Sequence, residues 1–74
     1  MLIRSQDKKK ITTSLDLEVF NLPHSNEYRI NAGEVGYIGT YSTEEKAIKV
    51  LDMIQDAYER KNVFQMPNDG DVCE

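Results

Sequence analysis

The sequence contains one cysteine, Cys73, one histidine, His24, and no tryptophan. A single cysteine excludes a disulfide within the chain, and it fits a reducing, cytoplasmic compartment. Because His24 and Cys73 are the only soft metal ligands, a metal site has little support. A chain of 74 residues builds only a small core, which disulfides, metals or oligomerisation usually supplement. Oligomerisation is the supplement that remains.

Long apolar runs are also missing from the sequence. No run approaches the roughly 18 residues that indicate a membrane span, and no apolar signal-peptide region follows Met1. The formal net charge is −4, which disfavours duplex DNA because cationic contacts with phosphate supply most of that affinity. We therefore expect a cytoplasmic protein that binds neither membranes nor duplex DNA directly.

Catalytic motifs are scarce. Cys73 and His24 are the only formal nucleophile and base, and nearby carboxylates disfavour the thiolate of Cys73. Gly33, Gly36 and Gly39 precede a strand pattern rather than a helix, so they do not form a phosphate-binding loop. The sequence predicts a protein that is not an enzyme and uses no cofactor.

The clearest pattern that is present predicts an amphipathic helix over residues 42–61. Ser42, followed three residues later by Glu45, forms a capping box at the start. Asn62 can take the left-handed conformation that ends a helix. Helical spacing places one set of apolar side chains on a single face, which we expect to pack on the core. This set is Ala47, Val50, Leu51, Ile54, Ala57 and Tyr58.

Two further apolar residues, Ile48 and Met53, lie on opposite flanks of this face. A wide helix face can pack into a curved sheet, or one flank can form a homodimer contact. The solvated face also carries an acidic i, i+4 pair, Asp52 and Asp56, which slightly destabilises a helix. The candidate interface residues are therefore Ile48, Met53, Asp52 and Asp56.

The rest of the chain has the pattern of short strands separated by turns. Residues 1–5 predict a strand, and residues 11–14 either complete a loose hairpin with it or begin an extended loop. Residues 15–22 alternate in polarity and should pair as a hairpin with residues 27–31. The intervening residues 23–26 supply proline, serine and asparagine for the turn.

Two residues in these strands stand out. Gly39, in the strand expected over residues 37–41, indicates a bulge or a close approach by another backbone or a ligand. Phe20 falls on the polar face of its strand, which indicates a bulge, an interface or a partly covered second face. After the helix, residues 63–66 predict a short strand that pairs with the N-terminal strand and turns Phe64 and Met66 toward the core.

These elements predict an α+β fold. It consists of a small antiparallel β-meander of three to five strands, one amphipathic helix packed on one face, and a short C-terminal strand. We expect residues 1–67 to form one domain. The acidic residues 68–74 are expected to be a disordered tail.

Positive charge is concentrated near the N-terminus. Residues 1–10 carry Arg4 and three lysines against Asp7, whereas residues 68–74 carry no base. A local basic patch on an acidic protein suits a small anion better than a polymer, although such charges also form ordinary solvated loops. The candidate ligand residues are six hydrogen-bond donors suited to a phosphate and one aromatic residue, Tyr37, that could stack on a base. They are Arg4, Gln6, Lys8, Lys9, Lys10, Arg29 and Tyr37. Phe20 could also stack on a base.

Three blocks of the sequence resemble a family of small proteins of Firmicute genomes, phages and prophages. They are LIRSQDK at residues 2–8, IGTYSTEEKA with VLDMI at residues 38–47 and 50–54, and VFQMP at residues 63–67. Residues 11–35 match no pattern in that family. The resemblance implies a protein without a catalytic motif, and small phage proteins of that kind are often inhibitors that act by binding.

The leading hypothesis is a phage or mobile-element protein that counters host defence. It would sequester an anionic, nucleotide-like ligand in the host cytoplasm without turnover. The alternative is a protein–protein inhibitor or adaptor that binds a host protein through the acidic helix face, as a nucleic-acid mimic. In either case we expect a homo-oligomer.

Overall fold

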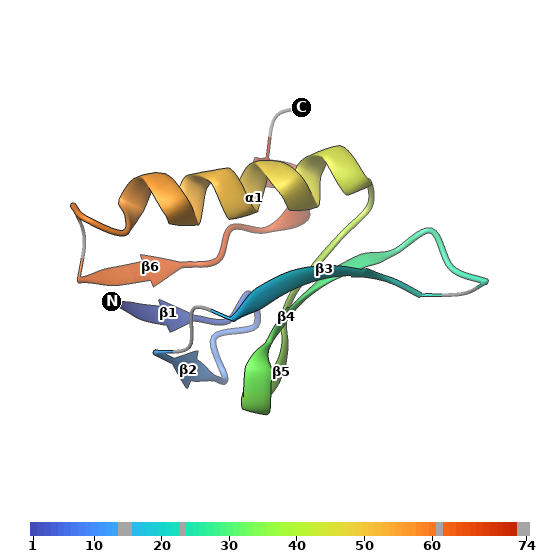
Figure 1. Cartoon of the computed structure of the whole chain (residues 1–74). Coiled ribbons are helices and arrows are strands. Elements are labelled where there is room, and N and C mark those ends of the chain that lie inside the picture. Colours follow the sequence, from blue (N-terminus) through green and yellow to red (C-terminus); the bar gives the residue numbers. More distant parts are fainter. Residues whose placement is uncertain (14–15, 23, 61, 73–74) are drawn as a thin grey trace.

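A computed structural model describes residues 1–13, 16–22, 24–60 and 62–72 (Figure 1). Two small three-stranded sheets and one helix enclose a common core. Antiparallel pairing dominates, and all but one of the strand pairs are antiparallel. The predicted α+β fold is confirmed. The division of the strands into two sheets was not expected from the sequence.

The first sheet has the order β2-β1-β6. Strand β1 (Leu2–Arg4) pairs antiparallel with β2 (Ile11–Thr12) and parallel with β6 (Val63–Gln65). The N-terminal segment therefore forms the hairpin, not the extended loop. The expected pairing of the last strand with the first is confirmed, and its register places two buried side chains, Ile3 and Phe64, side by side.

The second sheet is an antiparallel meander of order β3-β4-β5. It comprises β3 (Leu17–Asn21), β4 (Tyr28–Ala32) and β5 (Gly36–Tyr41). The predicted hairpin is confirmed for these residues, while Leu15 and Pro23 lie outside the described part of the chain.

The 3₁₀ turn η1 (Gly33–Val35) joins β4 to β5. The register shifts from Ile30 opposite Gly39 to Asn31 opposite Tyr37, which leaves Ile38 as the extra residue of a bulge. A Cβ atom at Gly39 would also lie 3.0 Å from Cε of Met66 and 3.0 Å from Cε2 of Tyr41. The bulge expected at this glycine is therefore confirmed, whereas its close neighbours are the side chains of Met66 and Tyr41 rather than the backbone or ligand that the sequence suggested.

The helix α1 (Glu44–Ala57) is shorter than the predicted range of residues 42–61, and its N-cap lies one residue later than predicted. Its N-cap is Thr43, whose hydroxyl accepts a hydrogen bond from the Lys46 N–H at 3.1 Å. The predicted capping box at Ser42 is wrong because the Ser42 N–H donates instead to Asp69 Oδ1, at 2.7 Å. At the other end Lys61, expected in the last turn, lies outside the described residues.

Most of the predicted helix stripe forms the core. Ala47, Val50, Ile54 and Ala57 are buried, and Leu51 is partly buried against the same cluster. Tyr58 is the exception, because it follows the last helical residue and leaves its side chain 52% exposed. The strands complete the core, and the expected burial of two residues in the C-terminal segment is confirmed. These residues are Phe64 and Met66.

Residues 68–72 differ from the expected disordered tail. They include the 3₁₀ turn η2 (Asp69–Asp71), and Val72 joins the core with only 5% of its surface exposed. Asp69 lies beside the start of α1, where Lys46 Nζ approaches its Oδ2 at 3.6 Å. The polarity of residues 68–72 suggested disorder, but the Asp69 carboxylate binds the Ser42 N–H and Lys46 at the start of the helix. These partners lie far away in the sequence, so polarity alone did not reveal them. The last two residues, Cys73 and Glu74, lie outside the described chain.

Replacing Gly39 with alanine should destabilise the fold. The added methyl would meet Tyr41, which is buried and whose hydroxyl donates to the Pro67 carbonyl at 2.8 Å, so the ring has little room to move. We expect Gly39→Ala to lower the free energy of unfolding by about 1–3 kcal/mol in urea denaturation. Gly70→Ala is the matched control, because nothing lies within 4 Å of its Cβ position. Equal stability of the two variants would contradict the close packing.

The attachment of residues 68–72 should depend on pH. The hydrogen bond from Ser42 holds the pKa of Asp69 below its ordinary value of 3.8. A carboxyl group whose pKa is lowered on folding stabilises the protein above its unfolded pKa, and that stability is lost as the pH falls through the folded pKa. Asp69→Asn should therefore show a smaller loss of melting temperature between pH 7 and pH 3 than the wild type. The control is Asp71→Asn, two residues further along in η2, which removes a carboxylate but keeps the acceptor of the Ser42 N–H, and it should show the wild-type loss.

Candidate functional site

A small hollow lies where the two sheets meet. It has a volume of about 290 Å³ and receives side chains from the turn after β1, from β4 and from β5. Of the seven ligand residues predicted from the sequence, the structure brings together Gln6, Lys10, Arg29 and Tyr37. Their convergence follows from the strand pairing, since β4 and β5 are neighbours and the turn after β1 lies against β5.

Lys10 supplies one cation to this hollow. Its Nζ donates to the carbonyl oxygens of Val35, at 3.0 Å, and Tyr37, at 3.5 Å. These bonds fix the ammonium group at the end of η1. An ammonium carries three N–H donors, so one donor remains beyond these two contacts for an anion.

Arg29 supplies the second cation. Its Cζ lies 4.6 Å from the centre of the Tyr37 ring, a cation–π contact. Its Nη2 lies 3.3 Å from Oε2 of Glu27, and its buried Nε has no hydrogen-bond partner among the described residues. The guanidinium is thus held in place by a ring and a carboxylate while part of its donor capacity is unused.

The aromatic residues lie on the open face of the β3-β4-β5 sheet. Tyr37 is 40% exposed, and the ring centres of Phe20 and Tyr37 are 6.5 Å apart. In the β3–β4 register Phe20 faces Arg29, so three neighbouring strands contribute to one aromatic and cationic cluster. The polar-face position of Phe20 therefore marks a partly covered second face, one of the alternatives drawn from the sequence.

A carboxylate limits the positive charge of the hollow. Asp7 accepts hydrogen bonds from the Ser5 hydroxyl, at 2.6 Å, and from the Lys9 N–H, at 2.9 Å. These bonds, the Ser5 bond first, hold the pKa of Asp7 below its ordinary value, so it is charged at neutral pH. They shape a turn in which Lys8 has φ +68°. Sequence reasoning did not include Asp7 in the site, although an Asx turn was a readable signal.

Gln6 has a structural role that the sequence did not reveal. Its Oε1 accepts the Thr40 N–H at 3.0 Å, and its Nε2 donates to the carbonyl oxygens of Thr40 and Pro67, each at 3.1 Å. The side-chain amide is therefore already engaged in joining the two sheets. For this reason we do not retain Gln6 as a ligand donor.

The other basic residues predicted for the site lie outside the hollow. Arg4 Nε donates to the Lys8 carbonyl at 3.2 Å, and the Arg4 side chain projects from the exposed side of β1. Lys8 and Lys9 are exposed in the turn. They contribute positive potential near the hollow rather than contacts within it.

The four interface residues predicted on α1 lie together on its outer side. Ile48, Met53, Asp52 and Asp56 share a shallow hollow of about 440 Å³ with Glu45 and Lys49. Ile48 is 46% and Met53 38% exposed. The outer flanks of the helix are therefore uncovered, and the alternative in which both residues pack into a curved sheet is not realised.

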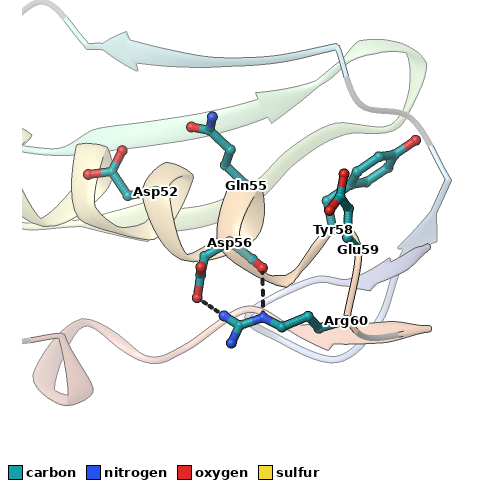
Figure 2. Close-up of a pocket in the computed structure, with 6 residues that line it drawn as sticks. All are labelled: Asp52, Gln55, Asp56, Tyr58, Glu59 and Arg60. Carbon is teal, nitrogen blue, oxygen red and sulfur yellow. Dashed lines mark hydrogen bonds and ion pairs between the residues drawn. The ribbon is translucent and has the colours of Figure 1, made fainter.

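A larger, open hollow of about 730 Å³ lies at the C-terminal end of α1, and Figure 2 shows the six residues that line it. Asp56 forms an i, i+4 ion pair with Arg60, whose Nε also donates to the Asp56 carbonyl oxygen at 3.2 Å. Asp52 and Glu59 have no ion pair among the described residues. The described residues contain no group of three or more His, Cys, Asp or Glu side chains placed to hold a metal ion. This region is an acidic surface rather than an enclosed site.

Gln6→Met should separate a structural role from a ligand role. Loss of the amide leaves the backbone N–H and C=O of Thr40 without their partner, which typically costs about 1–3 kcal/mol. We expect a fall of that size in urea denaturation, measured without any ligand. Gln55→Met on the exposed side of α1 is the control and should change stability little. A Gln6→Met variant as stable as this control would exclude the structural role.

In the described part of the chain, no helix is long and apolar enough to cross a membrane. Comparisons with protein-family models, with curated proteins and with solved structures give no match.

Proposed function

We propose that the protein is a stoichiometric binding protein for a small anionic ligand of nucleotide type, which occupies the hollow between the two sheets. The observation that carries this proposal is the convergence of Lys10 and Arg29, from different elements, beside the exposed ring of Tyr37. Cations and an aromatic ring are the groups that recognise a phosphate and a base together.

The charges around the hollow favour an anion with a single negative charge. Lys10 and Arg29 bring two positive charges, while Asp7 and the Glu27 partner of Arg29 bring two negative ones. Lys8 and Lys9, in the adjoining turn, add positive potential. A phosphodiester, which carries one charge, therefore fits this balance better than a free phosphate dianion.

The size of the hollow agrees with a small ligand or with part of a larger one. Its volume of about 290 Å³ is close to the lower limit of about 300 Å³ for small-molecule sites. A phosphodiester would contact Lys10 and Arg29 inside the hollow. The attached base would extend toward Tyr37 and Phe20 on the open face of the sheet.

The resemblance to small phage and prophage proteins supports a biological setting for such binding. In this proposal the protein acts in the cytoplasm of a host cell and sequesters a signalling nucleotide, which weakens a defence response. Sequestration requires a bound complex and no turnover, so it needs none of the catalytic groups that the sequence lacks.

A second candidate function rests on the outer face of α1. The exposed carboxylates of Glu45, Asp52 and Asp56 line the same shallow hollow as the apolar side chains of Ile48 and Met53. This arrangement suits a basic protein surface, as in an inhibitor or adaptor that imitates nucleic acid. Such binding would weaken steeply as salt is added.

The first proposal is tested by titrating the protein with cyclic AMP, AMP, adenosine and inorganic phosphate in calorimetry. Cyclic AMP, with one phosphodiester charge and a base, should bind most tightly of the four. Lys10→Met and Arg29→Gln should each weaken its binding by about tenfold or more, because each removes a charge-assisted hydrogen bond worth about 1.5–3 kcal/mol.

Lys49→Met is the matched control for this titration. It removes one positive charge from the exposed side of α1, away from the hollow, and should leave the affinity unchanged. Absence of binding at millimolar cyclic AMP, or equal binding by all three variants, would contradict the proposed site.

A further inference from the structure

Strand β3 is an unprotected edge of its sheet. The sheet order ends at β3, and no described strand lies beyond it. At the two ends of β3, the Asp16 carbonyl accepts the Gly33 N–H and the Leu22 N–H donates to the Glu27 carbonyl. The backbone groups of Asp16 and Leu22 therefore point toward the β4 side. In an antiparallel ladder the backbone N–H and C=O groups of successive residues point to opposite sides of the strand. The backbone groups of Leu17, Val19 and Asn21 therefore point outward, away from β4.

The opposite edge of the same sheet is covered. On β5, the Ile38 carbonyl accepts the Gln6 N–H at 2.7 Å, and the Gln6 side chain pairs with both backbone groups of Thr40. Proteins commonly protect sheet edges with prolines, lysines, bulges or a covering segment. Strand β3, with the sequence LEVFN, has neither proline nor lysine. The two edges thus differ in a way that singles out β3.

An apolar groove runs beside this edge. It has a volume of about 280 Å³ and is lined by Leu17 of β3 together with Leu51, Ile54, Gln55 and Tyr58 from the helix end. Tyr58, which is exposed rather than packed in the core, forms part of the wall of this groove. An unpaired strand edge and an uncovered apolar groove therefore occur on the same side of the molecule.

We propose that β3 pairs antiparallel with β3 of a second copy, across a two-fold axis at Val19, so that two sheets join into one of six strands. In this register Val19 faces Val19, and Leu17 faces Asn21 of the second copy. Glu18 faces Phe20 of the second copy, so the carboxylates of the two Glu18 side chains are not opposed. The grooves of the two copies then face each other and cover their apolar side chains mutually.

The second copy is favoured over an unrelated peptide because the edge complements itself. One two-fold axis satisfies the outward backbone groups of all three residues, with two hydrogen bonds for each facing pair. It also brings a matching apolar helix flank to the groove, which a single extended peptide does not carry. This inference does not depend on the proposed ligand.

The contact is small, which sets the expected strength. A strand of five residues extends for about 17 Å, so the strand edge and one helix flank stay below the roughly 800 Å² per partner of a standard stable interface. We therefore expect a dimer in exchange with monomer, with an oligomeric state that changes with protein concentration.

Sedimentation velocity over about 1 μM to about 1 mM protein tests the proposal. The wild type should pass from monomer to dimer within this range. Asn21→Pro removes an outward N–H without touching a β3–β4 bond, and a proline is tolerated at such an edge position. Tyr58→Lys places a charge in the groove. Each variant should raise the dissociation constant of the dimer by about tenfold or more.

Met53→Lys is the matched control, because Met53 is an exposed apolar residue on the opposite flank of the same helix. It should dimerise like the wild type. A monomeric wild type at every concentration would overturn the proposal and leave the edge open to an extended peptide. Dimerisation that survives both Asn21→Pro and Tyr58→Lys, or that is lost only in Met53→Lys, would overturn it in favour of another surface. Tyr58→Lys decides the matter if Asn21→Pro does not fold.

Discussion

The side chain of Gln6 makes the central contact of this fold, at the junction of the two sheets. Its amide pairs with both backbone groups of Thr40, as a neighbouring strand would, and it also holds the Pro67 carbonyl. Two short sheets that lack a continuous ladder between them are thereby fixed in relation to each other. The contact satisfies the edge of β5 at the same time. Because buried or edge backbone groups are costly when unpaired, one amide stabilises the junction and specifies its geometry.

The hollow is a consequence of this junction. Gln6 holds the turn after β1 against β5, and the turn brings Lys10 to the end of η1, where two carbonyl groups fix its ammonium. Arg29 arrives independently from β4 and is oriented by Tyr37 and Glu27. Backbone carbonyls therefore hold one cation and neighbouring side chains hold the other, which would limit the side-chain freedom lost if an anion bound there. The opposite end of the sheet, at β3, is free of this constraint and remains exposed.

Local signals predicted the elements of the fold well, and distant contacts account for the differences. The β3–β4 hairpin and the core face of α1 follow from alternation and helical spacing, which act over a few residues. The helix cap moved from Ser42 to Thr43 because Asp69, far along the chain, takes the Ser42 N–H. Gln6 looked like a ligand donor because its partners lie 34 and 61 residues away. The sequence identified both Lys10 and Arg29 as candidate ligand residues, but only the pairing of the strands shows that they line the same hollow.

The parallel pairing of β1 with β6 has a consequence for the order of folding. β1 and its partner β6 are separated along the chain by the other strands and α1, so the β2-β1-β6 sheet cannot be completed until residues 63–65 have been synthesised. The β3-β4-β5 meander and α1 make contacts between neighbouring segments, so they can assemble before β1 pairs with β6. Closure of the first sheet is then the step that seats Gln6 and creates the hollow. A ligand for this hollow would therefore be recognised only by chains in which β6 has already joined β1.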